Sequence, residues 1–154
     1  MIKVNVILNN IIWKKYLKNP HSFIDKKIAL LNKKNKLYTK NTLIFSLLLS
    51  GKSEIKKLNK KFRKKNKSTD VLSFPFYEKK QLNNKIKKEK EIYLGDIIIN
   101  LNEIKNKNNK NKFQEELNKL WIHGLVHLFG YQHKKNQDFN AMNKIEKKYL
   151  EYIN

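Results

Sequence analysis

Hydrophobic and polar positions alternate over residues 2–8, and this period of two predicts a half-buried β-strand. Three further short apolar segments predict strands: residues 43–49, closed by Ser50 and Gly51, residues 71–74, stopped by Pro75, and residues 96–101. The run at 43–49 is continuously apolar except for one serine, so we expect it to be covered on both faces.

In four other segments apolar residues recur every three or four positions, as they do along an amphipathic helix. The first helix is expected to follow Asn19 as N-cap, with Pro20 at its first position, and the second to follow Ser53. The third spans about 112–129, and the last about 137–153. The second helix places three apolar residues on one stripe: Ile55, Leu58 and Phe62. The last is expected to face inward with six: Phe139, Met142, Ile145, Tyr149, Leu150 and Ile153.

Two lysine-rich tracts, residues 79–91 and 105–112, carry few apolar side chains and are interpreted as loops within one domain. With 154 residues the chain is long enough for one core and short for two. The pattern therefore predicts a single α/β (α+β) domain over residues 1–154, in which a small, mostly four-stranded sheet is flanked by about five helices.

The chain is strongly basic, with 35 lysine and arginine residues against 13 acidic ones and a net charge of +22. Such a charge attracts polyanions, of which nucleic acid is the usual one. All of these basic residues except Arg63 are lysines, in a chain rich in asparagine and isoleucine. AT-rich codons produce that composition, so part of the charge could be solvated surface without a partner.

Composition also indicates where the protein works. The chain has no cysteine, which excludes disulfides and thiolate metal sites and suits a reducing cytoplasm. Its start does not resemble a secretory signal, and its longest apolar run is far shorter than the roughly 20 residues of a membrane span. We therefore expect a cytoplasmic protein with no membrane partner.

The segment HGLVHLFGYQH, residues 123–133, contains three of the four histidines. His123 and His127 are four apart and project from the same side of a helix, so both imidazoles can reach one ion. Gly130 is suited to end the helix and to turn the chain so that His133 returns to the pair. The spacing H-x-x-x-H-x-x-G-x-x-H matches the histidines and glycine of the extended metzincin signature. It predicts one metal ion, preferably zinc, with an open position for water and hence hydrolytic chemistry.

The substrate class follows from what surrounds the histidines. Metalloproteases carry a glutamate after the first histidine, but this chain has Gly124, and Glu116 lies two turns away, about 10 Å along the helix. Hydrolysis of a phosphodiester, with cations neutralising the phosphate, does not need that base. Arg63 is the candidate cation because its guanidinium can hold a phosphate through two hydrogen bonds. The alternative is that Arg63 only pairs with a carboxylate such as Asp70.

Four segments together resemble the YbeY family of bacterial single-strand-specific endoribonucleases, the ribosomal RNA maturation factors. They are LNKKFR at 58–63, STDVLSFP at 68–75, LGDIII at 94–99 and HGLVHLFGYQH at 123–133. The resemblance implies an α/β fold and one zinc ion held by His123, His127 and His133. It also implies that Arg63 matches the family's functionally important cleft arginine.

The same resemblance implies a role in 3′-end maturation of 16S ribosomal RNA and in small-subunit quality control, with single-stranded RNA, the small ribosomal subunit and assembly proteins as partners. The chain departs from the family at Gln132, where an aspartate usually precedes the third histidine, so metal affinity or activity is expected to be lower. Asp70 and Asp96 match family positions that could orient ligands or substrate, or could serve only as caps and strand ends.

Two rival functions stay open at this point. The first is a non-catalytic RNA-binding assembly factor whose zinc is structural, which requires a fourth protein ligand, for example His21. The second is a metallopeptidase, which requires a carboxylate from another part of the fold.

Overall fold

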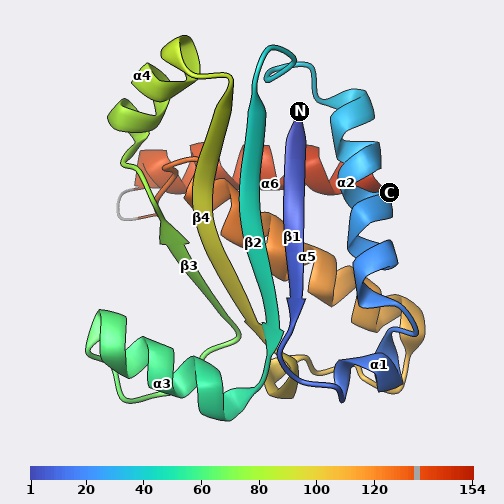
Figure 1. Ribbon diagram of the computed structural model, residues 1–154. Helices are drawn as coiled ribbons and strands as arrows, with labels where there is room; N and C mark the ends of the chain where they lie inside the picture. The colour runs from blue at the N-terminus through green and yellow to red at the C-terminus, as the bar shows by residue number, and fades with distance from the viewer. Residues whose placement is uncertain (134–135) are drawn as a thin grey trace.

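A four-stranded sheet forms the centre of the molecule (Figure 1). Its strands are β1 (Ile2–Leu8), β2 (Thr42–Ser50), β3 (Val71–Pro75) and β4 (Glu91–Asn100), and their order is β1-β2-β4-β3. β1, β2 and β4 are parallel, whereas β3 is antiparallel to β4 and forms one edge. The computed structural model describes residues 1–133 and 136–154.

Helices lie mainly on one face of this sheet. They are α1 (Trp13–Tyr16), α2 (Pro20–Lys34), α3 (Lys52–Arg63), α4 (Lys79–Lys88), α5 (Lys110–Leu128) and α6 (Asn136–Ile153), with a 3-10 turn η1 (Leu101–Glu103). α5 and α6 cross behind the strands and α2 runs beside β1, while α3 packs at one end of the front face (Figure 1). The predicted α/β class is confirmed. In the described part of the chain no helix is long and apolar enough to cross a membrane.

The main core lies between the sheet and α5, and β2 supplies its centre. Leu43, Phe45, Leu47 and Leu49 are fully buried toward the helices, whereas Ile44, Ser46 and Leu48 on the other face are only half-buried. The predicted strand is therefore confirmed, but the prediction that it is covered on both faces is wrong. The front face is only partly covered, because α3 packs against one end of it.

β4 begins at Glu91, five residues before the predicted start. The prediction missed its first residues because a bulge interrupts the alternation of inward and outward side chains. Ile92 and Leu94 point into the core, and then the phase shifts so that the next inward residue is Ile97. The shift occurs at Gly95, whose φ is +134°. An added Cβ there would lie 2.1 Å from the carbonyl oxygen of Phe74, so only glycine fits.

The tract 79–91 was predicted to be a loop, and this is wrong, because it forms α4 and the start of β4. Glu78 and Gln81 form a capping box at the start of α4. Leu82 is buried, and Ile86 one turn later packs against the same core. Two apolar side chains at helical spacing are enough to stabilise a helix when the neighbouring core completes their burial.

Three smaller expectations differ from the structure. Ser53 does not cap α3; Gly51 is the N-cap, and the Asn102 side-chain oxygen accepts from the Lys52 amide at 3.0 Å instead. Phe62 and Phe139 lie on the solvent side of their helices, at 59% and 55% exposure. The Asn19 cap and Pro20 start of α2 are confirmed, with the Asn19 side chain accepting from Ser22 at 3.0 Å.

Close packing of α5 on β4 depends on Gly124. A Cβ at this position would lie 2.7 Å from the Ile97 Cγ2 atom. We expect Gly124→Ala to lower the free energy of unfolding by up to about 2 kcal/mol, because overpacking costs about 1–3 kcal/mol and the gain in helix propensity returns about 1. Urea denaturation measures the change. Lys119→Ala, at an exposed position of the same helix, is the control, and a Gly124→Ala protein more stable than wild type would contradict this account.

Candidate metal centre

α5 presents two histidines toward the β3 side of the molecule. The helix starts at an Asn109 cap, whose side chain accepts from the Lys112 amide at 3.0 Å, and its apolar stripe packs on the sheet. Leu117 and Trp121 of this stripe have no exposed surface, whereas Leu120 is half-buried. His123 and His127 lie at the border of this stripe and are half-buried.

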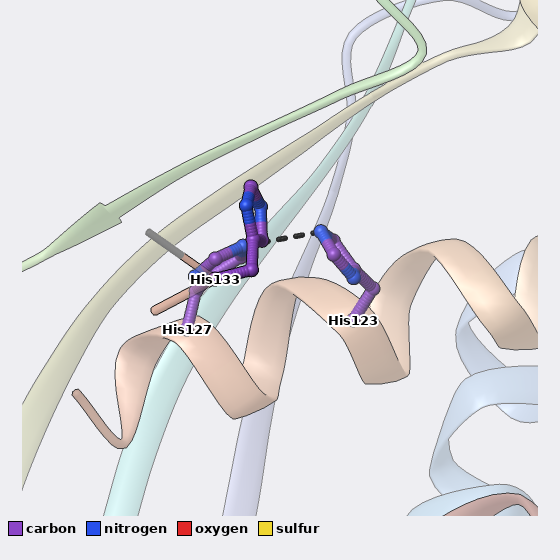
Figure 2. Close-up of side chains that lie close together, drawn as sticks. All are labelled: His123, His127 and His133. Atoms are coloured by element: carbon purple, nitrogen blue, oxygen red, sulfur yellow. Dashed lines mark hydrogen bonds between the residues drawn. The ribbon is translucent and has the colours of Figure 1, made fainter. Parts of the chain in front are cut away.

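A glycine turn returns the third histidine to this pair. Gly130 has a φ of +83°, and its amide donates to the His127 carbonyl at 2.8 Å. The first residue of α4 packs directly on the turn, because a Cβ on Gly130 would lie 2.7 Å from the Lys79 Cα atom. As predicted, His133 comes back to the other two: one nitrogen from each of the three rings lies within 4.8 Å of the others. Figure 2 shows the three rings directed toward one another above α5.

The outward nitrogens of the helical pair are held by fixed acceptors. The Nδ1 atom of His127 lies 2.8 Å from the Tyr131 carbonyl oxygen, and that of His123 lies 2.8 Å from a Glu146 carboxylate oxygen on α6. A carbonyl or a carboxylate can only accept, so both Nδ1 atoms must donate. In the neutral rings both Nε2 atoms then carry lone pairs.

Those two Nε2 atoms nevertheless lie 3.1 Å apart, the contact drawn as a dashed line in Figure 2. Two facing lone pairs repel each other unless a proton or a cation lies between them. Nitrogen ligands at about 2.0–2.1 Å from a tetrahedral zinc ion stand about 3.3 Å apart, close to the observed spacing. The donor set of three imidazoles therefore fits a zinc-like cation.

Burial prepares His127 for this role. Desolvation is the main cause that lowers its pKa below the ordinary value, although the hydrogen bond to the Tyr131 carbonyl opposes it. The ring is thus neutral at pH 7, and no proton has to be displaced before it can ligate a metal.

The three histidines open into a cavity of about 890 Å³ between β3, α4 and the turn after α5. Arg63, the last residue of α3, lines the same cavity although it is 60 residues from His123 in sequence, so the structure brings together the four predicted site residues. Among the described residues Arg63 forms no ion pair with Asp70. Asp70 instead accepts from the Val71 amide at 2.8 Å and from the Thr69 hydroxyl at 3.1 Å.

Comparison with known proteins places this arrangement in a family. The family model described as endoribonuclease YbeY matches residues 9–154. The chain belongs to the YbeY family. An endoribonuclease YbeY from Pelagibacter ubique is 39% identical over 99% of this chain and 97% of its own length. One from Thermodesulfovibrio yellowstonii is 35% identical over 82% of this chain and 74% of its own length.

A solved structure from Thermotoga maritima has the same fold. It superposes with a TM-score of 0.58 at 28% identity and covers 99% of this chain and 89% of that one. The YbeY-like resemblance of the sequence is thereby confirmed.

The two aspartates of the YbeY-like segments have different positions in this chain. Asp70 lines the cavity, and its carboxylate is held by the neighbouring Val71 amide and Thr69 hydroxyl. Asp96 lies on the front face of the sheet, where its carboxylate accepts from the Tyr93 hydroxyl at 2.6 Å, and it is not among the cavity-lining residues. Gln132 lines the cavity beside His133 and is exposed.

Sequence reasoning missed Glu146, whose carboxylate accepts from the His123 ring in this structure. Its carboxylate is 23% exposed and comes from α6, whose contact with α5 is tertiary. It lies four residues after Met142 and three before Tyr149, both buried, which places it near the border of the inward stripe of α6 and was the only available signal.

We expect Glu146→Gln to weaken metal binding about 10–100-fold, because a neutral amide supports the donating Nδ1 of a metal-ligating histidine less well than a carboxylate. Competition with a chromogenic zinc chelator measures the affinity. Glu151→Gln, an exposed residue of the same helix, is the matched control. Equal affinities in all three proteins would show that Glu146 does not orient a ligand.

Proposed function

We propose that this chain is a zinc-dependent endoribonuclease that cleaves single-stranded RNA. One observation carries the proposal: three imidazoles converge, two of them with the lone pairs of their Nε2 atoms facing each other, in a cavity that is also lined by the one arginine of the chain. His123, His127 and His133 would hold the ion. When bound, a zinc ion supplies an activated water and positive charge for a hydrolytic reaction.

The protein's own groups supply the remaining functions of the site. Arg63 binds a phosphate of the substrate through its guanidinium fork. Glu146 and the Tyr131 carbonyl fix the two helical rings, so that the ligands need little reorganisation. The net charge of +22 favours a polyanionic substrate.

Membership in the YbeY family supports a biological role for this cleavage. We assign the protein to 3′-end maturation of 16S ribosomal RNA and to quality control of the small subunit, with that subunit and its assembly proteins as cytoplasmic partners. The four YbeY-like segments and the charge support this assignment.

Observations at the site argue against both rivals. A structural zinc needs a fourth protein ligand, yet within the described ranges only three residues form the metal-binding group, and His21 is exposed on α2 and outside it. A peptidase needs a carboxylate that is available to activate the metal-bound water, but the carboxylate beside the histidines, Glu146, is bound to the outward Nδ1 atom of His123. The two acidic residues that line the cavity are engaged elsewhere, Asp70 by the Val71 amide and Glu78 in the capping box of α4. Glu116 instead accepts from the backbone amides of Lys105 and Asn106, at 3.2–3.4 Å.

The proposal is tested by incubating the purified protein with a single-stranded RNA and with a duplex of the same sequence. We expect cleavage of the single strand only, its loss after treatment with a chelator, and its return on adding Zn²⁺. Cleavage that is unaffected by the chelator would contradict the role of the metal. A protein that contains one equivalent of zinc and still does not cleave RNA would contradict the proposal that it is a nuclease.

A further inference from the structure

The front face of the sheet carries a continuous row of aromatic side chains beside the cavity. The aromatic row consists of Phe62 on α3, Phe74 on β3, Phe76 just after β3 and Tyr93 on β4. Phe62 and Phe76 are 59% and 65% exposed, and Tyr93 is 36% exposed. Single exposed aromatics are ordinary, but a contiguous set on an uncovered sheet face indicates a binding surface.

Contacts within the row hold its rings at defined angles. The centroids of Phe62 and Phe74 are 5.3 Å apart and those of Phe76 and Tyr93 are 6.3 Å apart, with interplanar angles of 61° and 74°. Hydrogen bonds of the Tyr93 hydroxyl to Ser46, at 2.8 Å, and to Asp96 fix the last ring. The edge-to-face pairs leave ring faces open to solvent.

The row is continuous with the candidate metal centre at two points. Phe76 belongs to the row and also lines the cavity that contains the histidines. Arg63, which lines the same cavity, directly follows Phe62 at the end of α3. A ligand that leaves the cavity over the edge strand β3 therefore meets the aromatic row next.

Positive charge lies at the α3 end of the row. Glu54 is the only acidic residue between Lys52 and Lys67, a segment that forms α3 and the loop after it and contains many lysines. The Lys61 ammonium lies 5.2 Å from the centroid of the Phe62 ring. The carboxylate of Asp96 within the row is engaged by Tyr93. Aromatic rings flanked by cations are complementary to nucleic-acid bases and phosphates, not to an acidic or purely apolar partner.

We propose that the aromatic row binds the unpaired bases of single-stranded RNA by stacking, next to the site of cleavage. This inference rests on the proposed function, because it takes RNA to be the substrate that enters the cavity. Lysines of α3 and Arg63 contact the phosphates, and the rings contact the bases.

Spacing along β3 gives a physical reason for preferring single strands. Phe74 and Phe76 are two residues apart on an extended chain, so their Cα atoms are separated by about 6.6–6.8 Å. Successive bases in a stacked strand are about 3.4 Å apart. The separation is therefore about two base steps, so one base can fill the gap between the rings only when no stacked neighbour covers its faces, as neighbours do in a duplex.

Binding to two synthetic strands tests the inference. The metal-loaded full chain is titrated with a labelled phosphorothioate oligoadenylate, which resists cleavage, and with an abasic strand carrying the same number of phosphorothioate linkages. We expect Phe76→Ala to weaken binding of the oligoadenylate about 10-fold or more and to leave binding of the abasic strand unchanged. Phe62→Ala should behave in the same way.

Conservative variants and a surface control separate stacking from apolar burial. Phe76→Trp should retain wild-type affinity, whereas Phe76→Leu should lose it. Leu37→Ala removes a side chain that is 68% exposed outside the row and should change nothing.

If the Ala variants bind both strands as wild type does, or bind both more weakly by the same factor, then the row does not bind bases and the inference is wrong. A wild-type protein that shows base-dependent binding but never cleaves RNA would contradict the proposed function and leave the row supported.

Discussion

Replacing His127 with alanine is expected to abolish metal binding and to lower RNA cleavage on the order of a thousandfold or more, because one of three ligands is lost from a site with no spare donor. The Nε2 atom of His127 faces that of His123 at 3.1 Å, and its Nδ1 atom is already committed to the Tyr131 carbonyl. Among the described residues, only His123 and His133 of the metal-binding group then remain. Zinc content after dialysis and the rate of single-strand cleavage measure the two effects.

His21→Ala is the matched control for this prediction. His21 is an exposed histidine on α2, so its loss removes the same side chain from a position outside the cluster. We expect wild-type zinc content and activity from this variant. Thermal unfolding of His127→Ala without metal should resemble that of wild type without metal. Full cleavage by a zinc-free His127→Ala protein would show that the histidines are not the reactive centre.

Local spacing explains why the cluster of three histidines could be predicted from the sequence alone. His123 and His127 share a helix face whatever the tertiary fold, and Gly130 permits the left-handed turn that returns His133. The strands were likewise predicted where alternation was unbroken, as in residues 2–8. These features depend only on residues that are close to one another in the sequence.

Features that depend on distant residues could not be predicted. Glu146 reaches His123 only because α6 packs against α5. α4 carries just Leu82 and Ile86 as apolar contacts, and its helix depends on a core contributed by other elements. In β4 the bulge at Gly95 breaks the alternation that would have revealed the strand. In each case tertiary burial, not the local pattern, decides the structure.

The tract that was misread as a loop matters for function as well as for the fold. Residues at the start of α4 line the cavity and pack on the Gly130 turn, and the Lys79 ammonium lies 4.2 Å from the centroid of the Tyr131 ring. Tyr131 is the residue whose carbonyl accepts from His127. α4 therefore supports the ligand geometry from the side opposite to Glu146.

Arg63 is expected to contribute to the reaction without contributing to metal binding. Arg63→Ala should lower kcat/KM for single-stranded RNA about 10²–10³-fold, the usual cost of removing one preorganised donor from a developing negative charge, while zinc content stays at wild-type level. Its guanidinium lines the cavity and, among the described residues, has no carboxylate partner. Its charge is therefore available to a phosphate.

Two further variants separate geometry from charge at this position. Arg63→Lys keeps the positive charge but loses the planar fork, so we expect it to recover only part of the activity. Lys60→Ala removes an exposed cation one turn earlier on α3, outside the cavity, and controls for the general attraction of RNA to a basic helix. If Lys60→Ala and Arg63→Ala lower kcat/KM equally, then Arg63 acts only through long-range charge. A lower kcat confined to Arg63→Ala and partly restored by lysine requires direct contact with the reacting phosphate.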